Sequence, residues 1–134
     1  MNELTTTDRL EIAEVLSRYS HCLDRGRWED FAKLFTSDAR LDLSQVMGLY
    51  EGAAGIESFA AMMRSIPIVM RHYVTNVVID GDSEHARVEC YVLAMTGPVG
   101  ALNTATGFYA DDLVKQDGRW RIRSRRLTLD MPGA

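Results

Sequence analysis

The sequence predicts a single α+β domain, with helices in its first half and an antiparallel sheet after them. Apolar residues recur at helical spacing up to Pro67, and this period then disappears. From Met70 onward, runs rich in β-branched and aromatic residues are separated by glycine and aspartate turn signals. Because helices come first and strands follow, the two are expected to form separate layers. A chain of 134 residues is near the usual size of one domain, so we predict that 1–134 fold together.

Two helices are predicted to open the domain. Asp8 followed by Glu11 is typical of an N-cap and its reciprocal partner, and helical spacing continues to about Leu23. Gly26 supplies a stop signal. The stretch "RWEDFAKLF" then resumes helical spacing and predicts a second helix that reaches Phe35.

A third helix and the strands complete the predicted fold. The stretch "ARLDLSQ" alternates apolar and polar residues and predicts a short strand, and the glycine-punctuated "MGLYEGAAG" follows it. Apolar residues share one stripe from Gly55 to Arg64, which predicts the third helix. We expect a curved, mixed sheet of about five or six strands. Its four long strands are predicted at Met70 to Ile79, His85 to Met95, Thr104 to Lys115 and Arg119 to Asp130.

Composition and charge exclude several functional classes. A net charge of -4 does not favour nucleic-acid binding, and the basic stretch "RWRIRSRR" is best interpreted as an exposed strand. The sequence has neither a signal-peptide pattern nor an apolar run long enough to span a membrane, so we expect a cytoplasmic protein without a membrane partner. The cysteines form no metal or redox motif and the histidines show no ligand spacing. We therefore predict no metal and no cofactor.

The stretch "RHYVTNVVID" places a histidine inside a strand that otherwise suits a core. Alternation puts His72 on one strand face with Asn76, without deciding which face is covered. A strand histidine is more often structural, unless an acid orients one ring nitrogen and leaves the other free to accept a proton. Asp24, at the end of the first helix, is a candidate for that acid. Alternatively, Arg25 and Arg27 screen it at the surface.

Three stretches taken together, "IAEVLSRYSHCLDRGRWEDFAKLFTSDARLDL", "YEGAAGIESF" and "RHYVTNVVID", resemble the SnoaL-like branch of the nuclear transport factor 2-like superfamily. The resemblance covers nearly the whole chain. It implies a cone-shaped fold in which three N-terminal helices pack on a curved, mostly antiparallel mixed sheet that encloses a cleft. The superfamily includes dehydratases, isomerases, cyclases, a dehydrochlorinase, dioxygenase small subunits and binding domains, so fold alone does not give the activity.

Residue by residue, the resemblance implies a catalytic pair. Asp24 and His72 match the dyad of scytalone dehydratase and of hexachlorocyclohexane dehydrochlorinase, with His72 as the general base and Asp24 as its orienting partner. Tyr19 and Arg125 resemble a polar and a cationic site residue of the dehydrochlorinase. Strict alternation places Arg125 on the face opposite Trp120 and Ile122, so it would need a β-bulge to reach the cleft.

Two further residues complete the predicted site. Tyr50 could replace one water-binding tyrosine of scytalone dehydratase, and Asn76 is predicted to contact the substrate from the strand of His72. The second histidine of that enzyme has no match, because His85 lies in the charged stretch "DSEHARVE". Scytalone is therefore not the expected substrate.

The resemblance thus implies a cofactor-independent lyase or isomerase that acts on a small apolar or cyclic molecule by dehydratase- or cyclase-like proton abstraction. One alternative is a non-catalytic binding module for a small hydrophobic molecule. Another is a small structural subunit of an aromatic-ring dioxygenase-like assembly, which would use the outer face of the strand of Tyr91, Leu93 and Met95. The resemblance also implies a homo-oligomer, either a dimer or a trimer.

Overall fold

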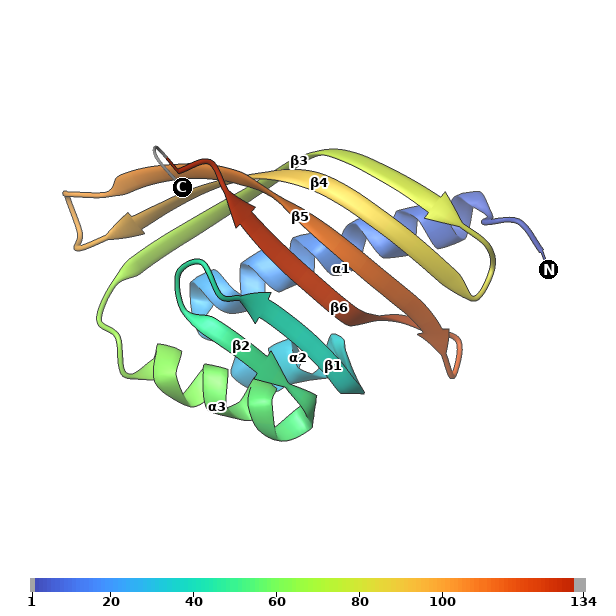
Figure 1. The fold of residues 1–134 in the computed structure, drawn as a ribbon, viewed down its shortest axis with the longest axis horizontal. Coiled ribbons are helices and arrows are strands. Elements are labelled where there is room, and N and C mark those ends of the chain that lie inside the picture. The colour runs from blue at the N-terminus through green and yellow to red at the C-terminus, as the bar shows by residue number, and fades with distance from the viewer. Residues whose placement is uncertain (1, 132–134) are drawn as a thin grey trace.

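The computed structural model describes residues 2–131. Within this range the chain forms three helices and six strands in two layers (Figure 1). The helices are α1 (Thr6–Arg25), α2 (Trp28–Lys33) and α3 (Gly52–Arg64). The strands are β1 (Phe35–Leu43), β2 (Gly48–Glu51), β3 (Val69–Gly81), β4 (His85–Gly97), β5 (Asn103–Gln116) and β6 (Arg119–Leu129).

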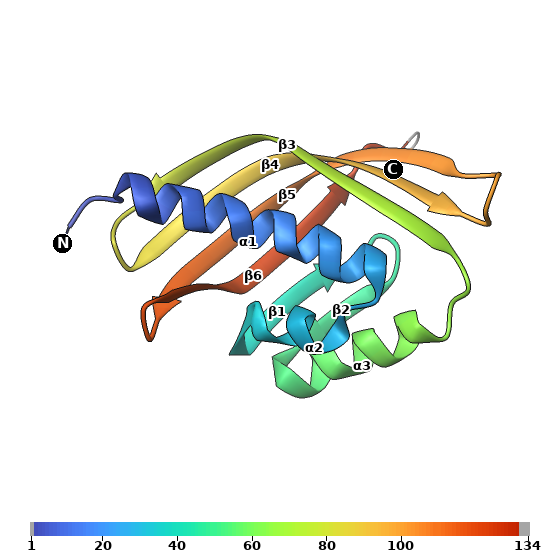
Figure 2. The same cartoon turned by 180° about the vertical axis from the view of Figure 1, so that it is seen from behind.

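The strands form one open sheet in the order β2-β1-β6-β5-β4-β3. Strands β3 to β6 pair antiparallel in sequence order, whereas β1 joins β6 in parallel and thereby makes the sheet mixed. Helix α1 crosses the inner face of the long strands, and α2 and α3 lie beside β1 and β2 (Figure 2). The predicted α+β class, with helices packed on a curved mixed sheet, is confirmed.

The N-cap of helix α1 lies three residues before the predicted one. Thr5 is the N-cap, and its side chain and that of Asp8 bond each other's backbone N–H groups, each at 3.0 Å. The capping box is therefore Thr5–Asp8 and not Asp8–Glu11. Asp8 is also buried, where its Oδ1 accepts hydrogen bonds from Trp120 Nε1 and Lys115 Nζ. Two acceptor oxygens let one carboxylate cap the helix and anchor it to the β5–β6 hairpin.

The predicted end of the second helix was wrong, and one strand was not predicted. Phe35 begins β1 instead of ending α2, because the backbone N–H of Ile122 bonds the carbonyl of Leu34 and starts the parallel pairing with β6. The stretch "GLYE" forms strand β2 along β1, with Tyr50 opposite Leu41. Helical spacing over "DFAKLF" continues past Lys33 although tertiary pairing ends the helix there.

Two β-bulges interrupt the regular alternation in the antiparallel part of the sheet. In β3, pairing with β4 shifts between Thr75 and Val78, and Asn76 between them has a φ of 55°. In β6, Ser124 pairs with Asp112 and Ile122 with Leu113, so Arg123 is an extra residue. An extra residue reverses the alternation beyond it.

The core lies between the inner face of the sheet and the helices. Aromatic side chains from α1, α2, α3 and β1 meet edge-on or tilted, which is the preferred geometry of such pairs. This cluster holds the C-terminal end of α1 against the sheet and thereby positions Asp24. Its members are Tyr19, Trp28, Phe31, Phe35 and Phe59.

Candidate functional site

Asp24 lies in the last turn of α1, which ends at Gly26 in a left-handed conformation with a φ of 67°. Its side chain is only 7% exposed. This burial rules out the interpretation of Asp24 as a surface carboxylate screened by Arg25 and Arg27. His72 lies near the beginning of β3, opposite Ala94 of β4, and its side chain is 11% exposed.

Asp24 contacts His72 at two points. Oδ1 lies 2.5 Å from the ring nitrogen Nδ1, and Oδ2 accepts a hydrogen bond of 2.8 Å from the backbone N–H of His72. Both carboxylate oxygens are therefore used, and one fixes the strand while the other fixes the ring. An acceptor at Nδ1 favours the tautomer with the proton on that nitrogen, which leaves Nε2 with a free lone pair.

The second ring nitrogen of His72 is open. Within residues 2–131, Nε2 makes no hydrogen bond, and it is not fully buried. A basic nitrogen that is unbonded and accessible can accept a proton from a bound molecule. The pair thus has the arrangement of an oriented general base.

Arg125 reaches the interior because of the bulge at Arg123. Beyond this extra residue the alternation reverses, so Arg125 shares the inner face with Ile122. Its side chain is fully buried, and its guanidinium lies 4.2 Å from the centre of the Tyr19 ring. The β-bulge that Arg125 was predicted to need in order to reach the interior is therefore present.

A buried aspartate and a tyrosine, Asp111 and Tyr109, hold Arg125 and were not predicted. Asp111 accepts hydrogen bonds of 2.8 and 2.9 Å from Nε and Nη2 of Arg125, and its side chain is also 0% exposed. The Tyr109 ring lies 3.7 Å from the guanidinium carbon. One signal was available in the sequence, because alternation in "GFYADDLV" places Asp111 on the apolar face with Tyr109 and Leu113.

Burial controls the ionisation of this cluster. It raises the pKa of Tyr19 to about 12, against the opposing effect of the Arg125 charge. Burial by itself would lower the pKa of Arg125, but the charge of Asp111 raises it above the usual value. Burial also raises the pKa of the nearby Cys90 thiol to about 11. At neutral pH, Tyr19 is therefore a protonated donor and Arg125 a permanent cation.

Two predicted substrate contacts are not joined to the dyad. Tyr50 is half-buried, and its hydroxyl donates a 2.6 Å hydrogen bond to the carbonyl of Met47. Asn76 is exposed in the β3 bulge, so it does not share the inner face with His72 as regular alternation requires. The roles of Tyr50 and Asn76 toward a substrate stay predictions.

A set of apolar side chains from several elements is only half-buried. They leave part of their surface accessible while packing against the core. Several are methionines, whose flexible thioethers suit irregular apolar ligands. The half-buried set contains Met47, Met62, Ile66, Met70, Val74 and Leu127.

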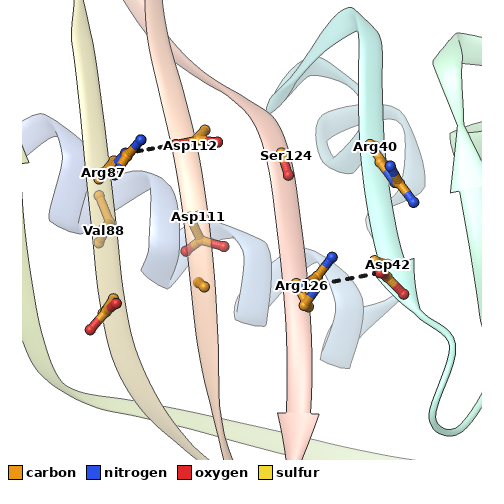
Figure 3. A pocket seen from close by; sticks show the side chains of 10 residues that line it. Arg40, Asp42, Arg87, Val88, Asp111, Asp112, Ser124 and Arg126 are labelled. Atoms are coloured by element: carbon orange, nitrogen blue, oxygen red, sulfur yellow. Dashed lines mark hydrogen bonds and ion pairs between the residues drawn. The ribbon is translucent and has the colours of Figure 1, made fainter.

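The outer face of the sheet carries a hollow of a different kind. It has a volume of about 350 Å³ and is lined largely by charged residues of β1, β4, β5 and β6 (Figure 3). Arg126 lies 3.3 Å from Asp42, and Arg87 lies 4.0 Å from Asp112. Exposed ion pairs of this kind contribute little to stability. This face is turned away from α1 (Figure 3).

Among the residues described, no group of three or more histidine, cysteine or acidic side chains could hold a metal ion. None of the helices in residues 2–131 is long and apolar enough to cross a membrane.

Comparisons with known proteins agree with this architecture. The model of the SnoaL-like domain matches residues 4–126. Rv2910c, an uncharacterized protein of Mycobacterium tuberculosis strain H37Rv, is 30% identical over 122 residues, which cover 89% of this chain and 83% of that protein.

Solved structures give the same result. A protein of unknown function with a cystatin-like fold from Nostoc punctiforme is 29% identical, with a TM-score of 0.81 over 98% of this chain and 96% of that one. A candidate scytalone dehydratase from Novosphingobium aromaticivorans is 26% identical, with a TM-score of 0.82 over 93% of this chain and 85% of that one. The aspartate-to-asparagine variant of Rv3472 from Mycobacterium tuberculosis is 25% identical, with a TM-score of 0.86 over 96% of this chain and 80% of that one. Because the family model spans nearly the whole sequence, this chain belongs to the SnoaL-like domain family.

Proposed function

We propose that this protein is a cofactor-independent lyase or isomerase that removes a proton from a carbon atom next to a carbonyl group. The observation that carries the proposal is the two-point contact between Asp24 and His72, which leaves Nε2 unbonded and accessible. Proton abstraction by a positioned base typically contributes about 10² to 10⁴ in rate.

In the first step, Nε2 of His72 accepts the proton, and the electrons of the C–H bond move toward the carbonyl oxygen to form an enolate. Asp24 stabilises the resulting imidazolium through Nδ1–H. Tyr19, which stays protonated, and the cation of Arg125 supply the charge stabilisation for the oxyanion.

The second step decides the reaction class. If the imidazolium returns the proton to another carbon atom, the product is an isomer. If the enolate expels a hydroxyl group at the β carbon, His72 can protonate this group and water leaves, which is a dehydration. Both routes restore the neutral histidine and need no external electron acceptor.

The family context supports a lyase or isomerase acting on a small molecule. One similar structure is named as a candidate scytalone dehydratase. Scytalone itself remains an unsuitable substrate, because His85 is exposed at the start of β4, far along that strand from Ala94, which faces His72. The half-buried apolar side chains favour a small, largely apolar ketone instead.

Hydrogen–deuterium exchange tests the proposal without knowledge of the product. Cyclic and aromatic ketones are incubated with the protein in D₂O, and NMR records the replacement of the proton next to the carbonyl group. We expect exchange of at least one ketone to be faster with the protein than with buffer. If the protein accelerates exchange of none of a broad panel, proton abstraction next to a carbonyl group is contradicted.

The outer face of the sheet supports a second inference, that copies of this chain associate there. Large apolar side chains are exposed on it, including Tyr91 at 60% and Phe108 at 41%. The adjoining charged residues alternate in sign across the strands (Figure 3). A two-fold axis can therefore bring opposite charges of two copies together around an apolar centre.

Analytical ultracentrifugation tests this association. The unmodified protein is expected to sediment as an oligomer and Tyr91→Glu as a monomer. Val99→Glu is the control, because Val99 is 86% exposed in the loop between β4 and β5. A monomeric unmodified protein would disprove the inference.

A further inference from the structure

Burial of the ion pair formed by Arg125 and Asp111 costs free energy, which suggests that the pair has a functional role. Both side chains are 0% exposed, and two charges taken out of water seldom stabilise a fold more than apolar residues of similar size. A β-bulge is also needed to turn Arg125 inward. Departures of this kind from simple core packing are expected at functional sites.

Arg125 is fixed on three sides. Asp111 binds Nε and Nη2, while the rings of Tyr19 and Tyr109 lie against the guanidinium at 4.2 and 3.7 Å. The remaining nitrogen, Nη1, is buried and has no hydrogen-bond partner within residues 2–131. An unpaired buried N–H is unfavourable, so this donor is suited to an oxygen atom of a bound molecule.

The contacts of this cluster extend toward the dyad. On the inner face, Asp111 of β5 lies beside Arg125 of β6. Tyr109 is the next inward-facing residue along β5, and its ring lies against the guanidinium. Next come Val74, Val92 and Gly107, which lie side by side on β3, β4 and β5, and then His72 beside Ala94. Tyr19, on the other side of the guanidinium, belongs to the same helix as Asp24.

We propose that Asp111 and Tyr109 are positioning residues, which hold Arg125 so that Nη1 and the Tyr19 hydroxyl receive an enolate or phenolate oxygen of the ligand. This inference rests on the proposed function and narrows its substrate class. The ligand would be a ketone or phenol whose oxygen lies toward Arg125 while its acidic carbon faces Nε2 of His72. Halogenated hydrocarbons, which have no such oxygen, would not be substrates.

A chromogenic phenol tests this arrangement in the full chain. The probe is 4-nitrophenol, whose visible absorption reports the fraction present as phenolate. We expect the unmodified protein to bind the phenolate about tenfold more tightly than the phenol, which lowers the apparent pKa of the bound probe by about one unit. Absence of binding at millimolar concentration, or preference for the neutral phenol, would overturn the proposal.

Paired substitutions identify the groups responsible. Arg125→Met combined with Asp111→Leu removes one cation and one anion together, which avoids leaving a single buried charge. We expect this variant to lose the preference for phenolate. The matched control is Arg126→Met with Asp112→Leu, which removes the same two charges one position further along each strand, where both side chains are exposed. The control should keep the preference, and an equal loss in both variants would contradict the proposal.

The single substitution Asp111→Asn separates positioning from charge. It leaves a more positive site, so a purely coulombic role for Arg125 predicts tighter phenolate binding. Positioning by Asp111 predicts weaker phenolate binding in the folded variant, and the opposite result would exclude that role. The probe undergoes no proton abstraction at carbon, so an unsuccessful search for ketone exchange would count against the proposed function and leave the oxyanion site standing.

Discussion

The carboxylate of Asp24 joins the end of helix α1 to strand β3 through both the backbone and the ring of His72. One oxygen accepts from the backbone N–H at 2.8 Å and the other contacts Nδ1 at 2.5 Å. This relationship fixes a strand position and a ring orientation with a single side chain. It also leads to a prediction that needs no substrate.

The tautomer of His72 should depend on Asp24. In the unmodified protein, we expect the neutral ring to carry its proton on Nδ1, because the carboxylate of Asp24 is the acceptor there. Asp24→Asn can place its amide N–H₂ group against Nδ1 and thereby favour the proton on Nε2. Nitrogen-15 NMR of the ring distinguishes the tautomers, with exposed His85 as an internal reference. The same tautomer in both proteins would show that Asp24 does not orient the ring.

Stability at acidic pH should depend on Asp8. Backbone and side-chain hydrogen bonds, first from Thr5 and then from Trp120, hold the pKa of Asp8 well below its usual range. A lowered pKa in the folded state means that the carboxylate stabilises the fold at pH values above about 4, the ordinary value in an unfolded chain. This contribution is lost as the pH falls below that value.

Urea unfolding at a series of pH values checks this effect. The unmodified protein should lose stability more steeply than Asp8→Asn below about pH 4. At neutral pH, Asp8→Asn should be less stable by about 1 to 3 kcal/mol, because the amide nitrogen cannot accept the hydrogen bonds that one of the carboxylate oxygens accepts. Parallel pH profiles would show that another carboxylate governs the acid transition.

The buried pair of Arg125 and Asp111 should show strong coupling in a double-mutant cycle. Arg125→Met alone leaves Asp111 unpaired in the interior and should cost about 3 to 5 kcal/mol. Adding Asp111→Leu should recover most of this loss, because apolar replacements of both partners are often neutral. Additive effects in chemical denaturation would contradict a coupled pair.

Gly107 should not tolerate a side chain. A Cβ atom there would lie 2.2 Å from the carbonyl oxygen of Thr128 in the backbone of β6. We expect Gly107→Ala to cost about 3 kcal/mol, near the upper end of the usual range for overpacking. Gly100→Ala is the comparison, because nothing lies within 4 Å and only its φ of 84° opposes the change, at roughly 1 kcal/mol. Equal losses of stability would show that β5 and β6 can separate at this point.

The class of fold and the contact between Asp24 and His72 could be predicted from the sequence for different reasons. Amphipathic periods of helices and strands are local, so the order of the long elements follows from them. The proximity of Asp24 and His72 was instead implied by resemblance to a family. The end of α2 could not be predicted, because it depends on the hydrogen bond from Ile122 to Leu34, between residues distant in the chain.

The inward orientation of Arg125 depends on a β-bulge, which the alternation of polar and apolar residues does not reveal. The bulge at Arg123 decides that Arg125 points inward, and a bulge has no fixed signature in a stretch as polar as "RIRSRR". Asp111, by contrast, could have been identified from its position on an apolar strand face. Asn76 was misplaced for the same reason as Arg125, because the β3 bulge breaks the alternation that linked it to His72.

The most direct measurement compares the unmodified protein with His72→Gln on a ketone that the protein deuterates in D₂O. Glutamine keeps a polar side chain but cannot act as a base, and the fold of the variant is verified by circular dichroism. If His72 abstracts the proton, the exchange rate falls by about 10² to 10⁴. Exchange at an unchanged rate in the folded variant would show that the proton is taken by another group.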